Sequence, residues 1–258
     1  MDWDSLVLRE GDRVEAWGRL VRAEAGEFLE PPVPVPAIAT PMVRAPTGFG
    51  VRVVGADFDG VERRKEYGGR VEGTATLSGR WLHGEFHVES QTPRRIGSPP
   101  RGRAWVKPPC PPPPEGWPNG KRDANLRFDL KDLEASGAAV AVTVFRPSPT
   151  QTVLVVAAAN PPAVEAVLRP QLGARLCIVP SRCSRAQVDA ARDTLDRRMD
   201  QSRIWAVGAG PDDQGQPVIT VELTLVEPDL AVWLAEQPEG LVRADAWLVP
   251  SSALPTAP

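Results

Sequence analysis

Two stretches of the chain echo each other and decide how its N-terminal part is interpreted: GDRVEAWGRLVRAEAGEF at residues 11–28 and GRVEGTATLSGRWLHGEF at residues 69–86. Residues 13–21 alternate apolar and polar side chains, and residues 70–77 repeat the alternation. A period of two with one apolar face is typical of a half-buried strand. Each copy spans only 18 residues. The echo therefore predicts two strand–turn–strand units of one barrel, not two repeated domains.

The rest of residues 1–95 favours the same kind of structure. Residues 51–54 form a further predicted strand, and the pair His83-Gly84 predicts a tight turn into another. We expect one short helical turn over 59–67 and a long irregular loop over 31–48. Short strands with glycines at bends predict a small closed or nearly closed β-barrel.

The strand patterns GDRVEAWGRL (11–20) and VEGTATLSGRW (71–81) resemble strands of OB-fold-like barrels. The resemblance covers residues 1–95. It implies a surface that binds single-stranded nucleic acid or oligosaccharide, although many such barrels contact only protein.

Indole rings among arginines are the predicted ligand-binding feature of this barrel. Trp17 lies on the polar face of its predicted strand, and Trp81 follows Arg80 in the second copy. Such rings stack on a base or sugar, and arginine adds charge. The alternative is that a neighbouring segment covers the rings. The predicted binding residues are Arg13, Trp17, Arg19, Arg80 and Trp81.

A proline-rich stretch at residues 96–122 divides the chain. Proline removes a backbone donor and fixes φ, so no helix or central strand is expected here. Pro111–Pro114 predicts a stiff polyproline II spacer in a solvated, basic tether. Two alternatives remain: an anionic polymer follows the basic residues with Trp105 and Trp117, or the prolines are a ligand for an aromatic groove.

Residues 123–250 have an α/β pattern, and we expect residues 251–258 to be a disordered tail. Asn160-Pro161 begins a predicted helix, and Ser184 with Gln187 predicts a capping box. We predict one mixed sheet with helices on one face, an α+β sandwich of ferredoxin-like or related type. The predicted strands are 138–145, 151–159, 175–180, 204–210, 217–227 and 241–249, and the predicted helices are 161–172, 185–200 and 229–236.

Composition excludes several classes of function. The net charge of −3 gives no whole-molecule reason to expect nucleic acid. Lysine is scarce among the 30 basic residues, a bias typical of GC-rich coding sequence such as that of actinobacteria. The longest apolar run, Val153–Ala159, is far too short to span a bilayer, and the N-terminus has no signal-peptide pattern. We therefore expect a cytoplasmic protein with no membrane segment.

Motifs for chemistry are also missing. The sequence has no phosphate-binding loop and no GxSxG motif, and GAGPDDQG (208–215) predicts a hairpin loop. His83 and His87, the two histidines, could chelate a metal only weakly from a surface hairpin. The three cysteines make no disulfide framework, and we expect Cys177 and Cys183 to be ordinary thiols. We predict no metal, no cofactor and no catalytic residue.

These observations favour a non-enzymatic two-domain binding or adaptor protein that acts through protein–protein contacts. One alternative is binding of single-stranded nucleic acid or oligosaccharide by the N-terminal barrel. The other is an enzyme that uses carboxylates in an interdomain cleft.

Overall fold

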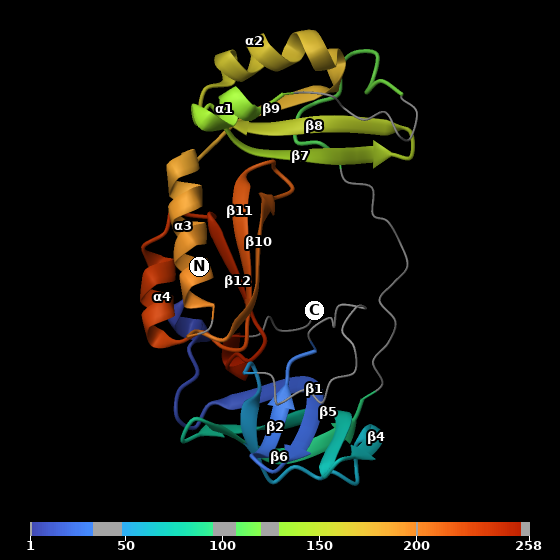
Figure 1. Cartoon of the computed structure of the whole chain (residues 1–258), viewed down its shortest axis with the longest axis vertical. Coiled ribbons are helices and arrows are strands. Elements are labelled where there is room, and N and C mark those ends of the chain that lie inside the picture. Colours follow the sequence, from blue (N-terminus) through green and yellow to red (C-terminus); the bar gives the residue numbers. More distant parts are fainter. Residues whose placement is uncertain (1, 33–47, 95–106, 120–128, 200, 254–258) are drawn as a thin grey trace.

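A computed structural model describes residues 2–32, 48–94, 107–119, 129–199 and 201–253. Its elements form three parts that are stacked along the long axis of the molecule (Figure 1). We call them the ring (β1–β6), the middle sheet (β10–β12) and the outer sheet (β7–β9). The chain is mostly β-strand, and among the described residues no helix is long and apolar enough to cross a membrane.

The ring occupies one end of the molecule. Its strands are β1 (Arg13–Ala23), β2 (Gly26–Glu30), β3 (Val51–Val54), β4 (Glu62–Tyr67), β5 (Arg70–Leu82) and β6 (Glu85–Pro93). They hydrogen-bond in the order β1-β2-β3-β6-β5-β4, and β1 also pairs with β5. Five strands therefore close on themselves, and β4 pairs with the start of β5 on the edge that pairs with β6 further along. Every pairing is antiparallel except that of β3 with β6.

The sequence echo has a structural explanation. The first copy is the β1–β2 hairpin, the second is the β5–β6 hairpin, and β1 pairs along its length with β5. Glycines permit close approach where the ring bends: a Cβ at Gly18 would lie 2.2 Å from the Glu30 carbonyl oxygen, and one at Gly79 would lie 1.9 Å from that of His87. Both predicted strand–turn–strand units are confirmed.

The prediction of a helical turn over 59–67 is wrong. Residues Glu62–Tyr67 form β4, which pairs antiparallel with β5. Its side chains are mostly exposed. Because they give no apolar period, only the free edge of β5 determines the conformation of this segment. The predicted loop at 31–48 lies almost entirely outside the described residues.

The outer sheet lies at the opposite end. It comprises β7 (Ala139–Ser148), β8 (Gln151–Ala158) and β9 (Leu176–Pro180), with α1 (Lys131–Ala135) before it and α2 (Pro161–Leu172) between β8 and β9. β7 and β8 are antiparallel, and β8 and β9 are parallel. α2 begins as predicted, since the Asn160 side chain accepts a hydrogen bond from the amide of Ala163. Val164 and Leu168 pack from α2 onto one face of the sheet.

The middle sheet repeats this connectivity. It contains β10 (Ile204–Pro211), β11 (Pro217–Leu223) and β12 (Val242–Ala246), with α3 (Arg185–Arg198) before it and α4 (Pro228–Ala235) before β12. β10 and β11 are antiparallel, and β11 and β12 are parallel. A strand–strand–helix–strand unit thus occurs twice.

The prediction of a single mixed sheet is therefore wrong, although the order of the elements after residue 138 is confirmed. β9 ends at Pro180, and the capping box of Ser184 and Gln187 begins α3 four residues later. α3 carries the chain away, so that β10 begins a separate sheet.

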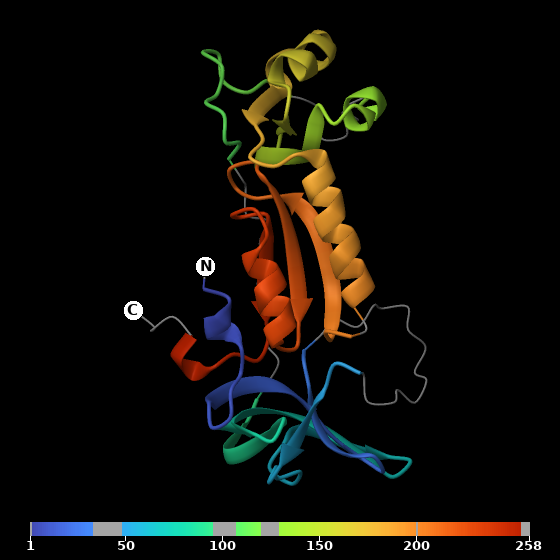
Figure 2. The same ribbon diagram turned by 90° about the vertical axis from the view of Figure 1, so that its left-hand side faces the viewer.

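The two ends of the chain each pack on a part that is distant in sequence. Val7, which follows η1 (Asp4–Leu6), is buried in the core of the middle sheet and forms a bridge with Val226. Figure 2 shows η1 beside α4. Leu248 is buried in the ring core, and Pro250 forms a bridge with Val14. In the predicted disordered tail, η3 (Ser251–Ala253) is a 3-10 turn, and residues 254–258 lie outside the described chain.

Candidate functional site

The predicted binding residues of the ring do not all share one face. Arg13 lies opposite Arg80 in the β1–β5 pairing, and Trp17 and Arg19 lie further along the same outer face of β1. Trp81 packs against the buried core of the ring instead. Since neighbouring residues of a strand point to opposite faces, an outward Arg80 requires an inward Trp81. The alternation within the second copy carried this signal.

The ring of Trp17 already has a partner. The guanidinium carbon of Arg94 lies 4.6 Å from the centroid of this indole. Thr74 holds the backbone here, because its hydroxyl donates to the Arg94 carbonyl oxygen at 2.7 Å. The Arg94 guanidinium therefore stacks on one face of the Trp17 indole.

Carboxylates pair with two arginines of this face, Arg19 and Arg80. Arg19 Nε donates to Glu30 Oε2 at 2.8 Å, and Arg19 Nη1 lies 3.6 Å from Glu72 Oε2. Arg80 Nε donates to Glu89 Oε1 at 2.9 Å. The hydroxyl of Tyr67 donates to Glu72, and burial followed by this hydrogen bond raises the pKa of Tyr67. A polyanion would therefore have to break these ion pairs in order to contact Arg19 and Arg80.

A second surface is built around residues 107–119, here called the proline segment. The predicted solvated tether is wrong for these residues, since they pack on the face of the outer sheet that α2 leaves open; 96–106 and 120–122 lie outside the described residues. Cys110 and Cys177 form a disulfide with their Cα atoms 5.8 Å apart. The prediction of an ordinary thiol is therefore wrong for Cys177, which is paired across 67 residues of sequence.

The far end of the proline segment is also anchored. Gln151 Nε2 donates to the carbonyl oxygen of Trp117 at 2.8 Å, and Asn119 forms an antiparallel bridge with Gln151. Trp117 packs with Cys110 against the buried cluster of Phe145, Val153, Val155 and Cys177. Between the two anchors, Pro111, Pro112 and Pro114 are exposed. Both ends of this short run are thus fixed to the outer sheet.

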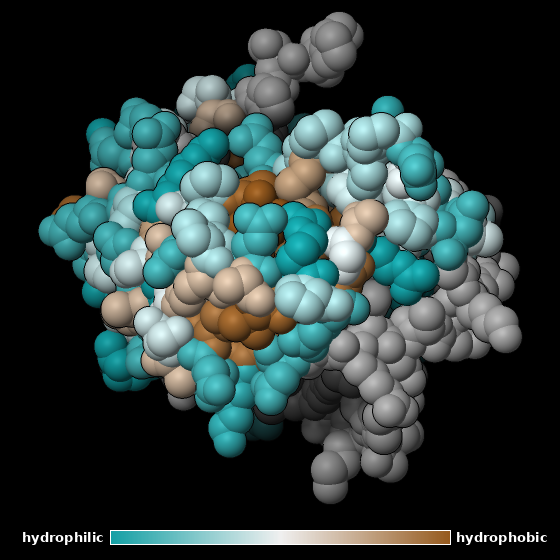
Figure 3. All heavy atoms as spheres, turned by 90° about the horizontal axis from the view of Figure 1, so that it is seen from above, coloured by the Kyte–Doolittle hydropathy of each residue, from teal (hydrophilic) through white to brown (hydrophobic). Residues whose placement is uncertain are grey.

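A groove of about 440 Å³ runs between the proline segment, α2 and β9. We call it the proline groove. Most of its walls are apolar or consist of proline rings. It is lined by Cys110, Pro111, Pro113, Trp117, Pro161, Glu165, Arg169, Ala174, Leu176, Cys177, Ile178 and Pro180. Seen from the α2 end, apolar side chains gather near the middle of the surface and hydrophilic ones border them (Figure 3).

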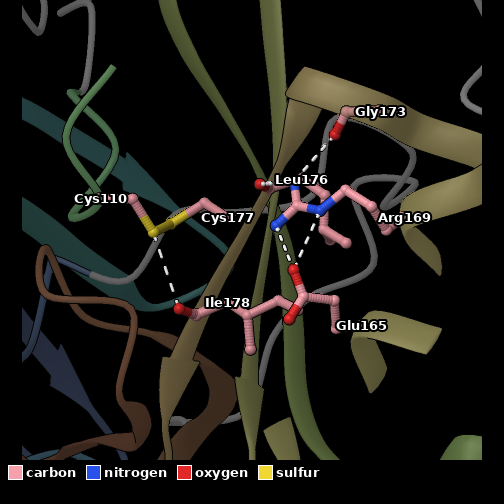
Figure 4. The surroundings of a disulfide bond; sticks show 7 residues. All are labelled: Cys110, Glu165, Arg169, Gly173, Leu176, Cys177 and Ile178. Carbon is pink, nitrogen blue, oxygen red and sulfur yellow. Dashed lines mark hydrogen bonds and ion pairs between the residues drawn. A yellow bond between two sulfur atoms is a disulfide. The ribbon is translucent and has the colours of Figure 1, made fainter. Parts of the chain in front are cut away.

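The groove follows the free edge of β9, where side chains contact the carbonyl oxygens. Arg169 Nη1 donates to the oxygen of Leu176 at 3.0 Å, and Cys110 Sγ lies 3.8 Å from that of Ile178 (Figure 4). Gln216 Nε2, from the β10–β11 hairpin, donates to the oxygen of Pro180 at 3.0 Å. These contacts protect the edge from pairing with another strand.

One ion pair gives the groove its polar character. Arg169 Nη2 lies 3.1 Å from Glu165 Oε1, one helical turn away on α2, and both side chains are roughly half exposed. Figure 4 shows this pair and the disulfide flanking β9. Arg169 also donates to the oxygen of Gly173 at 2.9 Å, which holds its guanidinium in place. The groove can therefore receive an apolar side chain beside a charged or hydrogen-bonding group.

Sequence reasoning missed this site. The spacing of Glu165 and Arg169 by four residues on a predicted helix was a readable signal. Nothing in the spacing of Cys110 and Cys177 indicated their pairing. Cys183, the third cysteine, is a buried free thiol whose pKa is raised by that burial. Within the described ranges, no group of three or more His, Cys, Asp or Glu residues is arranged to hold a metal ion.

Comparison with known proteins finds no matching family model, no matching curated protein and no matching solved structure.

Proposed function

We propose that this chain is a non-enzymatic binding or adaptor protein that recognises another protein through the proline groove. The observation that carries the proposal is the proline segment itself, which is fixed at Cys110 and at Trp117–Asn119. A segment that is ordered before binding loses little conformational entropy when a partner docks. Proline adds to this advantage because its φ is already restricted.

The chemistry of the groove suits a peptide or protein surface. Proline rings and the Trp117 indole offer apolar contact, and the half-exposed carboxylate of Glu165, held in place by Arg169, offers a hydrogen-bond acceptor. Interfaces of this kind combine an apolar centre with a few oriented polar groups. The exposed Pro111, Pro112 and Pro114 form a ridge that can bind in an aromatic groove of the partner.

In this proposal the ring is a scaffold of OB-fold-like type. The closed order of β1, β2, β3, β6 and β5, with a single parallel pair, supports that assignment. The paired charges around Arg19 and Arg80, and the inward position of Trp81, argue against single-stranded nucleic acid or oligosaccharide as its ligand. The cytoplasmic location stays a sequence-based prediction.

Site-specific photo-crosslinking in native lysate tests the proposal. A photoreactive residue at position 113, in the groove, should give a discrete adduct with one protein. The same probe at position 232, on the exposed face of α4, is the matched control and should not give that adduct. The substitution Trp117→Ala should weaken the adduct at 113. Absence of a specific adduct at 113 would contradict the proposal.

Titration with a single-stranded oligonucleotide at low salt tests the alternative ligand. We expect no change in tryptophan fluorescence, because Arg19 and Arg80 are already paired with carboxylates and Arg94 stacks on Trp17. A salt-dependent change that is lost in Trp17→Ala would favour the ring as a nucleic-acid surface instead.

A further inference from the structure

The two sulfurs of the disulfide differ in how a second molecule can reach them. Cys177 is 1% exposed and lies within β9, in the cluster of Phe145, Val153 and Val155. Cys110 is only partly buried and belongs to the proline segment, which forms one wall of the groove. A small thiol that enters the groove therefore meets Cys110 Sγ first.

The bond also determines where the proline segment lies. Near its start, the cross-link fixes Cys110 to β9, and Pro109 meets the β10–β11 hairpin, where a Cβ at Gly215 would come 3.1 Å from its ring. Contacts between uncharged side chains, such as Pro109 at the hairpin, are weaker than a covalent link. At its far end, the segment is held by non-covalent contacts: the hydrogen bond from Gln151 and the packing of Trp117 on the outer sheet. Breaking the disulfide removes the one covalent contact between the segment and the sheet.

We propose that Cys110–Cys177 is a thiol–disulfide exchange site whose substrate is a small-molecule thiol, and that its redox state sets whether the proline groove is formed. The effect on partner binding rests on the proposed function, whereas the exchange chemistry does not.

The exchange takes two steps. The thiolate of the small thiol attacks Cys110 Sγ, the Cys110–Cys177 bond breaks, and Cys177 leaves as a thiolate that takes up a proton. A second thiolate then attacks the sulfur of the small molecule in this mixed disulfide and releases the thiolate of Cys110, which is protonated in turn. Two thiols are thereby oxidised to their disulfide, and the protein disulfide is reduced to two thiols. The reverse reaction uses the oxidised form of the small molecule.

Reduction should release the start of the proline segment from β9. The contact between Cys110 Sγ and the Ile178 carbonyl oxygen then has no covalent support. The wall of the groove formed by Pro111 and Pro113 opens, and part of the β9 edge becomes accessible. The oxidised protein is therefore the form with a groove ready to bind.

Glutathione is the probe for the sulfur chemistry. The full-length protein is equilibrated with mixtures of reduced and oxidised glutathione, its thiols are trapped by alkylation, and each cysteine is quantified by mass spectrometry. We expect Cys110 and Cys177 to become labelled together as the mixture becomes more reducing. We expect the trapped glutathione adduct on Cys110 and unchanged labelling of Cys183. Labelling of Cys110 in the fully oxidised mixture, or an adduct only on Cys177, would overturn the proposal.

Cleavage by a glutamyl endopeptidase reports the position of the segment. The Glu115–Gly116 bond lies in a turn that is closed by the Gly116 amide and the Pro113 oxygen at 2.7 Å. On reduction, its cleavage should accelerate by more than about fivefold relative to other glutamates. Cys110→Ser should show the fast rate in every mixture, and Cys183→Ser should respond like the wild type. A cleavage rate of the wild type that is independent of redox state would refute the proposed release of the proline segment on reduction, even if Cys110→Ser fails to fold.

Crosslinking at position 113 in both redox states separates this inference from the proposed function. An adduct that forms only in the oxidised state supports both the exchange site and the proposed function. If the sulfur chemistry and the cleavage behave as expected while neither state gives an adduct, the exchange site stands and the proposed function fails.

Discussion

Leu248 offers a direct test of how the parts of this protein depend on each other. It comes from the end of the chain, beyond β12, yet its side chain is 0% exposed in the core of the ring. Its amide donates to the Thr224 oxygen at 2.8 Å, and the neighbouring Trp247 Nε1 donates to the Trp17 oxygen at 3.0 Å. Leu248→Ala should destabilise the ring by about 3 kcal/mol, the usual cost of removing a fully buried leucine side chain.

Hydrogen exchange measures this effect locally. A loss of about 3 kcal/mol corresponds to roughly 150-fold faster exchange of amides that open with the ring. We expect this acceleration in β1 and β5. The matched control is Leu168→Ala, which empties an equally buried position in the core of the outer sheet and should leave exchange in β1 and β5 unchanged.

The reasoning is refuted if Leu248→Ala accelerates exchange in β1 and β5 by less than about tenfold.

The same contacts bear on the predicted division at residues 96–122, which required two independently folding fragments. Because Val7 packs in the middle sheet and Leu248 packs in the ring, we expect fragments cut in this stretch to co-elute in size-exclusion chromatography. Fragments that separate and melt cooperatively alone would support the sequence-based division.

Three further predictions concern local features. Ser184→Ala removes one half of the capping box with Gln187 and should lower the free energy of unfolding by about 1 kcal/mol in urea denaturation. Burial, and then the charge of Asp229, raises the pKa of Glu227. The folded protein therefore binds the proton of the Glu227 carboxyl group more tightly than the unfolded chain does. The stability that this proton contributes is fully present below the unfolded pKa of Glu227 and is lost as pH rises through the folded pKa. Glu227→Gln should abolish that fall in a series of urea denaturations across acidic to neutral pH, and an unchanged slope would contradict the assignment. Gly79→Ala should cost about 2 kcal/mol or more, measured by thermal unfolding, because the added methyl group meets backbone and not a flexible side chain.

Features that depend on near neighbours were predictable from the residues alone. The alternation in β1 and β5 depends only on which side chains follow one another, and it predicted both strands. The start of α2 at Asn160-Pro161 and the capping box of α3 are also short-range, since each satisfies backbone groups within one helical turn.

Features that depend on partners distant in sequence were predicted incorrectly or missed. The charged segment that forms β4 has no period of its own and takes its conformation from the edge of β5. The order of strands and helices after residue 138 was predicted correctly, but not that they form two sheets, because pairing between strands is decided by which edges meet in space.

The sequence by itself determined strands β1 and β5 of the ring and the boundaries of the longer helices, since each follows from local sterics and short-range hydrogen bonds. Only the tertiary structure decided that Leu248 completes the ring core and that Cys110 meets Cys177. Packing brings together residues with no local relation, and the groove beside that disulfide exists only because the chain returns to the same edge of β9.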